Sequence, residues 1–145
     1  MLSLLLLLSY PTYPHDITPG SICTLPIEYR YEEHIPYCGR IVSDNTKKYI
    51  IKLYDETYGF KVGEMDRQDF TIDHYISLCM GGSNEVNNLW TQHKSTKAIT
   101  DPLEFLLCQK MVAGKIKQAE SIRLIKEAKM NLDKTQEILE YVRKL

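Results

Sequence analysis

The sequence lacks several features that would assign it to a class at once. A transmembrane helix needs roughly 20 apolar residues, and the longest apolar run, residues 1–9, is far shorter. There is no internal repeat, and the four cysteines never form a Cys-x-x-Cys pair, which excludes the usual zinc site built from four cysteines. The formal net charge is only −1, so the total charge gives no indication of nucleic-acid binding. What remains is the length and composition of one globular domain.

The apolar run at residues 1–9 is similar to the hydrophobic region of a secretory signal. No Lys or Arg precedes it, and no small-x-small cleavage site follows it, so a mis-started leader or a short hydrophobic arm is the alternative. We expect a leader and an irregular segment over residues 1–20, and a single domain over residues 21–145. Export would place the protein in the periplasm or outside the cell, without stable membrane insertion.

The four cysteines suit an oxidising compartment, where disulfides persist. They are Cys23, Cys38, Cys79 and Cys108. Four cysteines allow three connectivities, and sequence alone does not choose among them. We favour Cys23 with Cys38 and Cys79 with Cys108; the alternative is four buried thiols that act as small apolar side chains.

Charge is unevenly distributed along the chain. Residues 1–90 hold seven Lys or Arg against twelve Asp or Glu, a net of −5, whereas residues 91–145 hold eleven against seven, a net of +4. A local surface that attracts phosphate is therefore compatible with the neutral total. Solvated faces of helices would explain the same lysines.

Periodicity predicts an α+β fold that is mostly helical with one small β element. Residues 10–40 are rich in Pro and Tyr and are predicted to be irregular, and residues 60–69 to be a loop or hairpin arm. Helices are predicted over 44–58, between an N-cap at Ser43 and a stop at Gly59, and over 117–130. Further helices are predicted to begin at Asp101-Pro102-Leu103-Glu104 and at Asp133-Lys134-Thr135-Gln136, where capping patterns occur. Short strands are predicted from Phe70 to Tyr75 or Ile76 and at Leu89-Trp90.

The most informative stretch joins these two strands. It contains Ile72-Asp73-His74, then Gly81-Gly82, then Asn88-Leu89-Trp90, then His93. This order resembles the HNH endonuclease family, the ββα-metal or His-Me finger nucleases, over residues 67–104. The resemblance implies a two-stranded ββα-metal motif in a small exported nuclease that lacks the zinc-knuckle cysteines of many family members.

The resemblance also implies roles for individual residues. His74 would be the general base, because a near-neutral imidazole can take a proton from water. Asp73 and His93 would hold one divalent metal, Mg²⁺ or alternatively Mn²⁺ or Zn²⁺, which acts as a Lewis acid. Neighbouring side chains of a flat strand point to opposite faces, so Asp73 and His74 could share a site only where the strand twists or bulges. Asn88 matches the asparagine that holds the intervening loop.

The third metal ligand and the phosphate contacts complete the expected site. His93 comes sooner after the asparagine than the helix ligand of many family members, and Lys97 stands near that later position. Either His93 serves on a shortened connection or the third ligand is missing, with Asp101 as a distant substitute. Lys94, Lys97 and Arg67 would contact phosphate, although a surface ion pair explains Arg67 equally well.

The expected activity is metal-dependent hydrolysis of phosphodiester bonds in DNA, RNA or both, with low sequence specificity. The first alternative is a degenerate HNH fold that binds nucleic acid without cutting it. The second is a helical adaptor, which would expose apolar surface around Ile138 to Val142. The sequence sets no oligomeric state.

Overall fold

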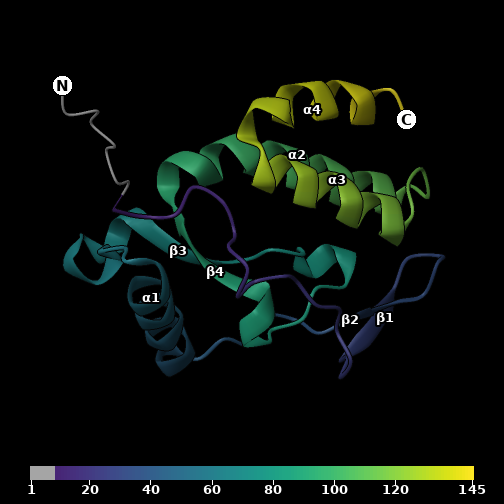
Figure 1. Ribbon diagram of the computed structural model, residues 1–145. Helices are drawn as coiled ribbons and strands as arrows, with labels where there is room; N and C mark the ends of the chain where they lie inside the picture. The colour runs from purple at the N-terminus through teal and green to yellow at the C-terminus, as the bar shows by residue number, and fades with distance from the viewer. Residues whose placement is uncertain (1–8) are drawn as a thin grey trace.

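A two-stranded antiparallel hairpin lies between one helix, α1, on one side and a layer of three helices, α2 to α4, on the other (Figure 1). The computed structural model describes residues 9–145. The predicted leader, apart from Ser9, lies outside the described residues. The fold is α+β, as predicted, with four α-helices and two small antiparallel sheets among the described residues.

The central hairpin consists of β3, Phe70–His74, and β4, Leu89–His93. Its register pairs Phe70 with His93 and His74 with Leu89. The strand β4 is longer than predicted, because Thr91 and Gln92 continue it although both are polar and fully buried. Burial of polar side chains hides a strand from a prediction that relies on apolar residues.

Helix α1, Asp44–Tyr58, confirms the predicted bounds. Ser43 caps its first turn by accepting a hydrogen bond from the backbone N–H of Thr46, and Gly59 ends it in the left-handed conformation at φ 77°. Its buried face presents Ile50 and Tyr54 to the hairpin. This contact makes α1 the cover of one hairpin face.

Helix α2, Lys94–Val112, begins directly after β4 and not at Asp101 as predicted. The ring of His93 caps it by accepting a hydrogen bond from the N–H of Ser95, and Pro102 lies inside the helix. Thr96 and Thr100 are buried in line with Leu103, Leu107 and Met111. Tertiary packing of this face therefore keeps the chain helical on both sides of the predicted capping pattern. That packing offsets the backbone hydrogen bond that proline removes.

The rest of the helical layer is α3, Gln118–Met130, and α4, Thr135–Arg143, both close to their predicted positions. They enclose the larger core with α2 and the first half of the β3–β4 loop, which contributes Ile76 and Met80. The apolar side chains Ile138, Leu139 and Val142 of α4 are buried there, and only Tyr141 is exposed. The apolar surface that would favour a helical adaptor is therefore packed inside the protein.

A second hairpin corrects the prediction that residues 10–40 are irregular. It pairs β1, Glu28–Arg30, with β2, Ile35–Tyr37, around a turn in which Tyr31 and His34 have positive φ. Strands of three residues with no apolar alternation leave little signal in a sequence. Five short 3₁₀ turns complete the described chain, at Val62–Glu64, Arg67–Asp69, Leu78–Met80, Val86–Asn88 and Leu132–Lys134.

The segment before the second hairpin packs along the domain. The Thr18 hydroxyl donates to the carbonyl of Leu89 at 2.9 Å and is hydrogen-bonded to the Tyr54 hydroxyl. The backbone N–H of Gly20 donates to the carbonyl of Asn87 at 2.9 Å. Thr18 and Gly20, which belong to the segment predicted to be irregular, thus contact β4 and the loop before it.

Two disulfides, Cys23–Cys38 and Cys79–Cys108, confirm the favoured pairing. The first holds the segments before β1 and after β2 together, and the second joins the β3–β4 loop to α2. Two such bonds fit an oxidising compartment. Within residues 9–145, no helix has the length and apolar character needed to cross a membrane.

Removing the disulfide that ties the loop to α2 is expected to destabilise the protein substantially. Replacing Cys79 and Cys108 together by alanine should lower the free energy of unfolding by about 2 to 4 kcal/mol, because the bond closes a loop of 29 residues. Urea denaturation followed by circular dichroism measures the change. The same replacement of Cys23 and Cys38, which close a loop of 15 residues, is expected to cost about 0.6 kcal/mol less. A larger loss there would contradict the chain-entropy explanation.

Candidate active site

The loop after β3 is held by one buried side chain, Asn88. Its Oδ1 accepts from the N–H of Ile76 at 2.9 Å, and its Nδ2 donates to the carbonyls of Ile76 and Ser83 at 3.0 and 2.8 Å. Asn88 is 0% exposed, so these three bonds satisfy backbone groups that water does not reach. The loop is thereby closed on the end of β3.

Two glycines permit this closure. Gly81 has φ 86°, a conformation that other residues rarely adopt. At Gly82, a Cβ atom would overlap the carbonyl oxygen of Ile76. The Gly-Gly turn therefore allows the backbone to pass close behind the end of β3.

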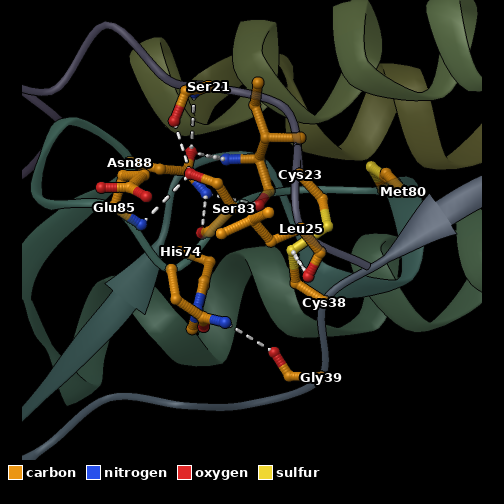
Figure 2. The surroundings of a disulfide bond; sticks show 12 residues. Ser21, Cys23, Leu25, Cys38, Gly39, His74, Met80, Ser83, Glu85 and Asn88 are labelled. Carbon is orange, nitrogen blue, oxygen red and sulfur yellow. Dashed lines mark hydrogen bonds between the residues drawn. A yellow bond between two sulfur atoms is a disulfide. The ribbon is translucent and has the colours of Figure 1, made fainter. Parts of the chain in front are cut away.

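The closed loop places Asn84 against His74. The Nδ2 of Asn84 donates to the carbonyl of Gly39 at 2.9 Å, which turns its Oδ1 toward the ring of His74. That oxygen is 2.8 Å from Nε2, and it accepts, so Nε2 carries the proton and Nδ1 keeps a free lone pair. Figure 2 shows His74 below the loop that carries Ser83 and Asn88, next to the Cys38–Gly39 segment. The arrangement fixes the tautomer that a general base requires.

The environment of His74 lowers the pKa of its imidazole below the usual 6.5. Burial is the largest cause, and the positive charges of Arg40 and Lys129 act in the same direction. The hydrogen bond with Asn84 and the charge of Asp73 oppose this change without reversing it. The ring is therefore neutral at pH 7, and only 3% of the residue is exposed.

This depressed pKa predicts how stability depends on pH. In the unfolded chain the imidazole binds a proton near pH 6.5, whereas in the folded protein it binds one only at lower pH. His74 therefore supports stability fully above pH 6.5, and that contribution is lost as pH falls toward the folded pKa. We expect the loss of unfolding free energy between about pH 7.5 and about pH 5.5 to be smaller in His74→Gln than in wild type. Equal losses in urea denaturation would contradict the assignment.

Asp73 points away from His74. Both residues belong to the regular β3–β4 ladder, where successive side chains alternate between faces, and Asp73 lies opposite Trp90. Its Oδ2 accepts from Nε1 of Trp90 at 3.0 Å and from Nζ of Lys129 at 2.9 Å. The twist or bulge that would let the acid and the base share a site is not formed in β3.

His93 lies on the face opposite to Asp73, at the other end of the ladder. It pairs with Phe70, three residues from Asp73, and its ring stacks on Tyr10 with the centroids 4.3 Å apart. Its Nδ1 accepts from the N–H of Ser95 as the cap of α2. The structure therefore does not bring the two predicted metal ligands together. In the part of the chain that the structure describes, no group of three or more His, Cys, Asp or Glu side chains is arranged to hold a metal ion.

The predicted phosphate contacts lie at two places. Lys94 and Lys97 are on the first turns of α2, where they pair with Asp69 at 2.9 Å and Asp101 at 3.1 Å. Surface pairs of this kind contribute little to stability, so both ammonium groups remain available to a polyanion. Arg67 is exposed, and its Nη1 donates to the carbonyl of Phe70 at 2.6 Å.

Arg67 also lines a pocket of about 270 Å³ beside β3, together with Arg40 and Lys47. The other lining residues are Val42, Phe70, Thr71 and Ile72. We call this the cationic pocket. Among residues 9–145, neither arginine has a carboxylate within 4.0 Å, and Lys47 only reaches Asp44 at 4.0 Å. Its position next to Ile72, two residues before His74, places three cationic side chains beside the strand that carries the imidazole.

Several of these residues were not predicted from the sequence. Asn84 lies within the Gly-Gly-Ser-Asn loop, and its proximity to Gly82 was the available signal. Arg40, Lys47 and Lys129 come from distant segments, and their isolated charges give no such signal in the sequence.

Comparison with protein-family models, with curated proteins and with solved structures found no match for this chain. The resemblance to HNH endonucleases therefore rests on the order of the motif residues in the sequence alone.

Proposed function

We propose that this protein hydrolyses phosphodiester bonds in nucleic acid, with His74 as the general base. The observation that carries the proposal is the bond between Asn84 and His74, which leaves the lone pair of a neutral imidazole on Nδ1. Asn88 and the Gly-Gly turn support this arrangement. In hydrolysis, Nδ1 accepts a proton from water as the water oxygen bonds to phosphorus. The bond to the leaving ribose or deoxyribose oxygen breaks, and that oxygen takes a proton from solvent.

The cationic pocket supports a polyanionic substrate. The guanidinium groups of Arg40 and Arg67 and the ammonium of Lys47 suit a phosphate group, and they would stabilise the charge that builds up on its oxygens. Contacts to phosphate do not distinguish one base sequence from another. We therefore expect DNA, RNA or both to be accepted with low sequence specificity. Lys94 and Lys97 extend the positive charge on α2.

A divalent metal does not fit the residues first expected to hold it. Asp73 and His93 lie on opposite faces of the hairpin, and the carboxylate of Asp73 already pairs with Lys129. The proposed hydrolysis therefore uses no metal bound by this pair. Mg²⁺, Mn²⁺ or Zn²⁺ bound in another way stays a prediction that cleavage assays test directly.

The two disulfides support a place of action outside the cytoplasm, in the periplasm or in the medium. Export would also keep a nuclease of low specificity away from the chromosome of the cell that makes it. The leader that this requires was predicted at residues 1–9.

A second candidate is a module that binds nucleic acid without cutting it. Two observations favour it: His74 is only 3% exposed, and Asp73 is neutralised by Lys129. The cationic pocket would serve binding alone equally well. Both candidates share the ββα framework and differ in the fate of the phosphodiester bond.

Cleavage of plasmid DNA and of RNA by wild type and His74→Ala distinguishes the candidates. Each protein is incubated with EDTA, Mg²⁺, Mn²⁺ or Zn²⁺ in parallel. His34→Asn is the control, because it removes an exposed imidazole outside the motif, and asparagine tolerates its positive φ. We expect cleavage by wild type and the control but not by His74→Ala. Binding that weakens with salt, without cleavage under any condition, would identify the binding module. If folded wild type neither cleaves nor binds nucleic acid, both candidates are overturned.

A further inference from the structure

Lys129 is the most deeply buried charge in the described chain, with only 1% of its side chain exposed. Its Nζ is 2.9 Å from Oδ2 of Asp73 and 2.7 Å from the carbonyl oxygen of His74. Oxygens of Tyr75 and Glu104 each lie 3.4 Å away. Four oxygens, two of them from carboxylates, thus surround one ammonium group at the end of β3.

This set of oxygens is of the kind that binds a hard cation. Carboxylates and backbone carbonyls are the ligands that Mg²⁺ and Ca²⁺ take in proteins. Here an ammonium group meets them at hydrogen-bond distances. Ser77 donates a hydrogen bond to Glu104 from the loop, so the second carboxylate is also held in place.

The opposite charges of this cluster stabilise one another in their ionised forms. Burial alone would lower the pKa of Lys129, but the charges of Asp73 and Glu104 raise it above its usual value. Burial would raise the pKa of Glu104, and the charge of Lys129 with the Ser77 hydrogen bond lowers it. Lys129 and Glu104 are therefore charged together at neutral pH.

We propose that the ammonium group of Lys129 is the resident cation of this ββα motif, taking at Asp73 and Glu104 the place that a divalent metal would occupy. Lys129 lies in α3, outside residues 67–104, and its neighbours Leu124, Ile125 and Ala128 anchor that helix in the core. The resemblance implied a metal at Asp73, whereas the fold supplies a side chain there. The chain therefore needs no divalent ion at Asp73.

Binding of Mn²⁺ tests this proposal independently of any nuclease activity. The ion is titrated into wild type and Asp73→Asn, with free Mn²⁺ measured by electron paramagnetic resonance. We expect no stoichiometric binding that depends on Asp73, so the two titrations should agree. One Mn²⁺ bound by wild type, with affinity reduced tenfold or more in Asp73→Asn, would overturn the proposal.

A matched pair of variants tests whether the oxygens can hold a metal once the ammonium is gone. Lys129→Ala opens the space, whereas Lys129→Met fills it with an apolar side chain of similar length. We expect Lys129→Ala alone to gain one Mn²⁺ site and a melting temperature that rises by about 5 °C or more in saturating Mn²⁺. A folded Lys129→Ala that gains no site would overturn the proposal. If circular dichroism shows that either variant is unfolded, the Mn²⁺ titrations of wild type and Asp73→Asn still test the proposal.

One consequence for activity rests on the proposed function. If the chain is a nuclease, its cleavage should not depend on a divalent ion bound at Asp73, because the charge there is already balanced by Lys129. Absence of cleavage under every condition would count against the nuclease and leave the Mn²⁺ result unaffected. Cleavage that EDTA abolishes, together with Mn²⁺ binding lost in Asp73→Asn, would confirm a nuclease and overturn the role of Lys129.

Discussion

Replacing Lys129 by methionine is expected to lower the free energy of unfolding by about 3 to 5 kcal/mol. The substitution nearly keeps the length of the side chain but removes its charge, which leaves Asp73 and Glu104 without the cation between them. The carbonyls of His74 and Tyr75 lose their donor as well. Urea denaturation at neutral pH, followed by circular dichroism, measures the change. Lys115→Met, at an exposed position between α2 and α3, is the control and should change stability little.

A partial rescue distinguishes lost charge balance from lost packing. Adding Asp73→Asn and Glu104→Gln to Lys129→Met removes both uncompensated carboxylates, so we expect the triple variant to be more stable than Lys129→Met alone. Equal or lower stability of the triple variant would show that the ammonium acts through its contacts with the backbone carbonyls. The buried pair would then contribute little by itself.

Replacing Asn88 by aspartate is expected to destabilise the protein by about 3 kcal/mol or more, although the two side chains have nearly the same shape. Asn88 donates to the carbonyls of Ile76 and Ser83, and an aspartate would turn a carboxylate oxygen toward both. A buried charge facing two carbonyl oxygens is either expelled or protonated, and both cost stability. Thermal unfolding and urea denaturation measure the loss.

The neighbouring Asn87 offers a matched control. It is exposed, and its Oδ1 accepts from the hydroxyl of Ser21, a bond that aspartate can also accept. Asn87→Asp is therefore expected to change stability by less than about 0.5 kcal/mol. Similar losses in the two variants would mean that Asn88 does not hold the loop through its amide group.

The sequence predicted those parts of the fold that local rules determine. Helix α1 begins directly after Ser43 and ends before Gly59, because a cap and a left-handed glycine act within a few residues. The capping pattern at Asp101 misled for the opposite reason. Buried threonines and a histidine cap extend α2 upstream through tertiary packing, and such packing overrides local preference. The hairpin of β1 and β2 is too short to leave a periodic signal.

The same distinction between local rules and tertiary packing applies to the candidate site. The strand order of Asp73-His74, the glycine turn and Asn88 follow from a contiguous motif, and the hairpin indeed forms around them. Whether Asp73 meets His93 depends on the register and the regular alternation of the ladder, which the order of residues does not show. Lys129 reaches Asp73 from 56 residues further along the chain, so only the packing of α3 reveals it.

The disulfide between Cys23 and Cys38 has a consequence for the order in which the protein matures. Cys38 precedes Gly39, whose carbonyl fixes the amide of Asn84, which in turn sets the proton on His74. In a chain with free thiols, no disulfide fixes the position of Cys38, and the neighbouring carbonyl of Gly39 is held less firmly against Asn84. If the chain is the nuclease proposed above, this oxidation would complete its assembly, and its activity would appear only after Cys23 and Cys38 have met an oxidising compartment.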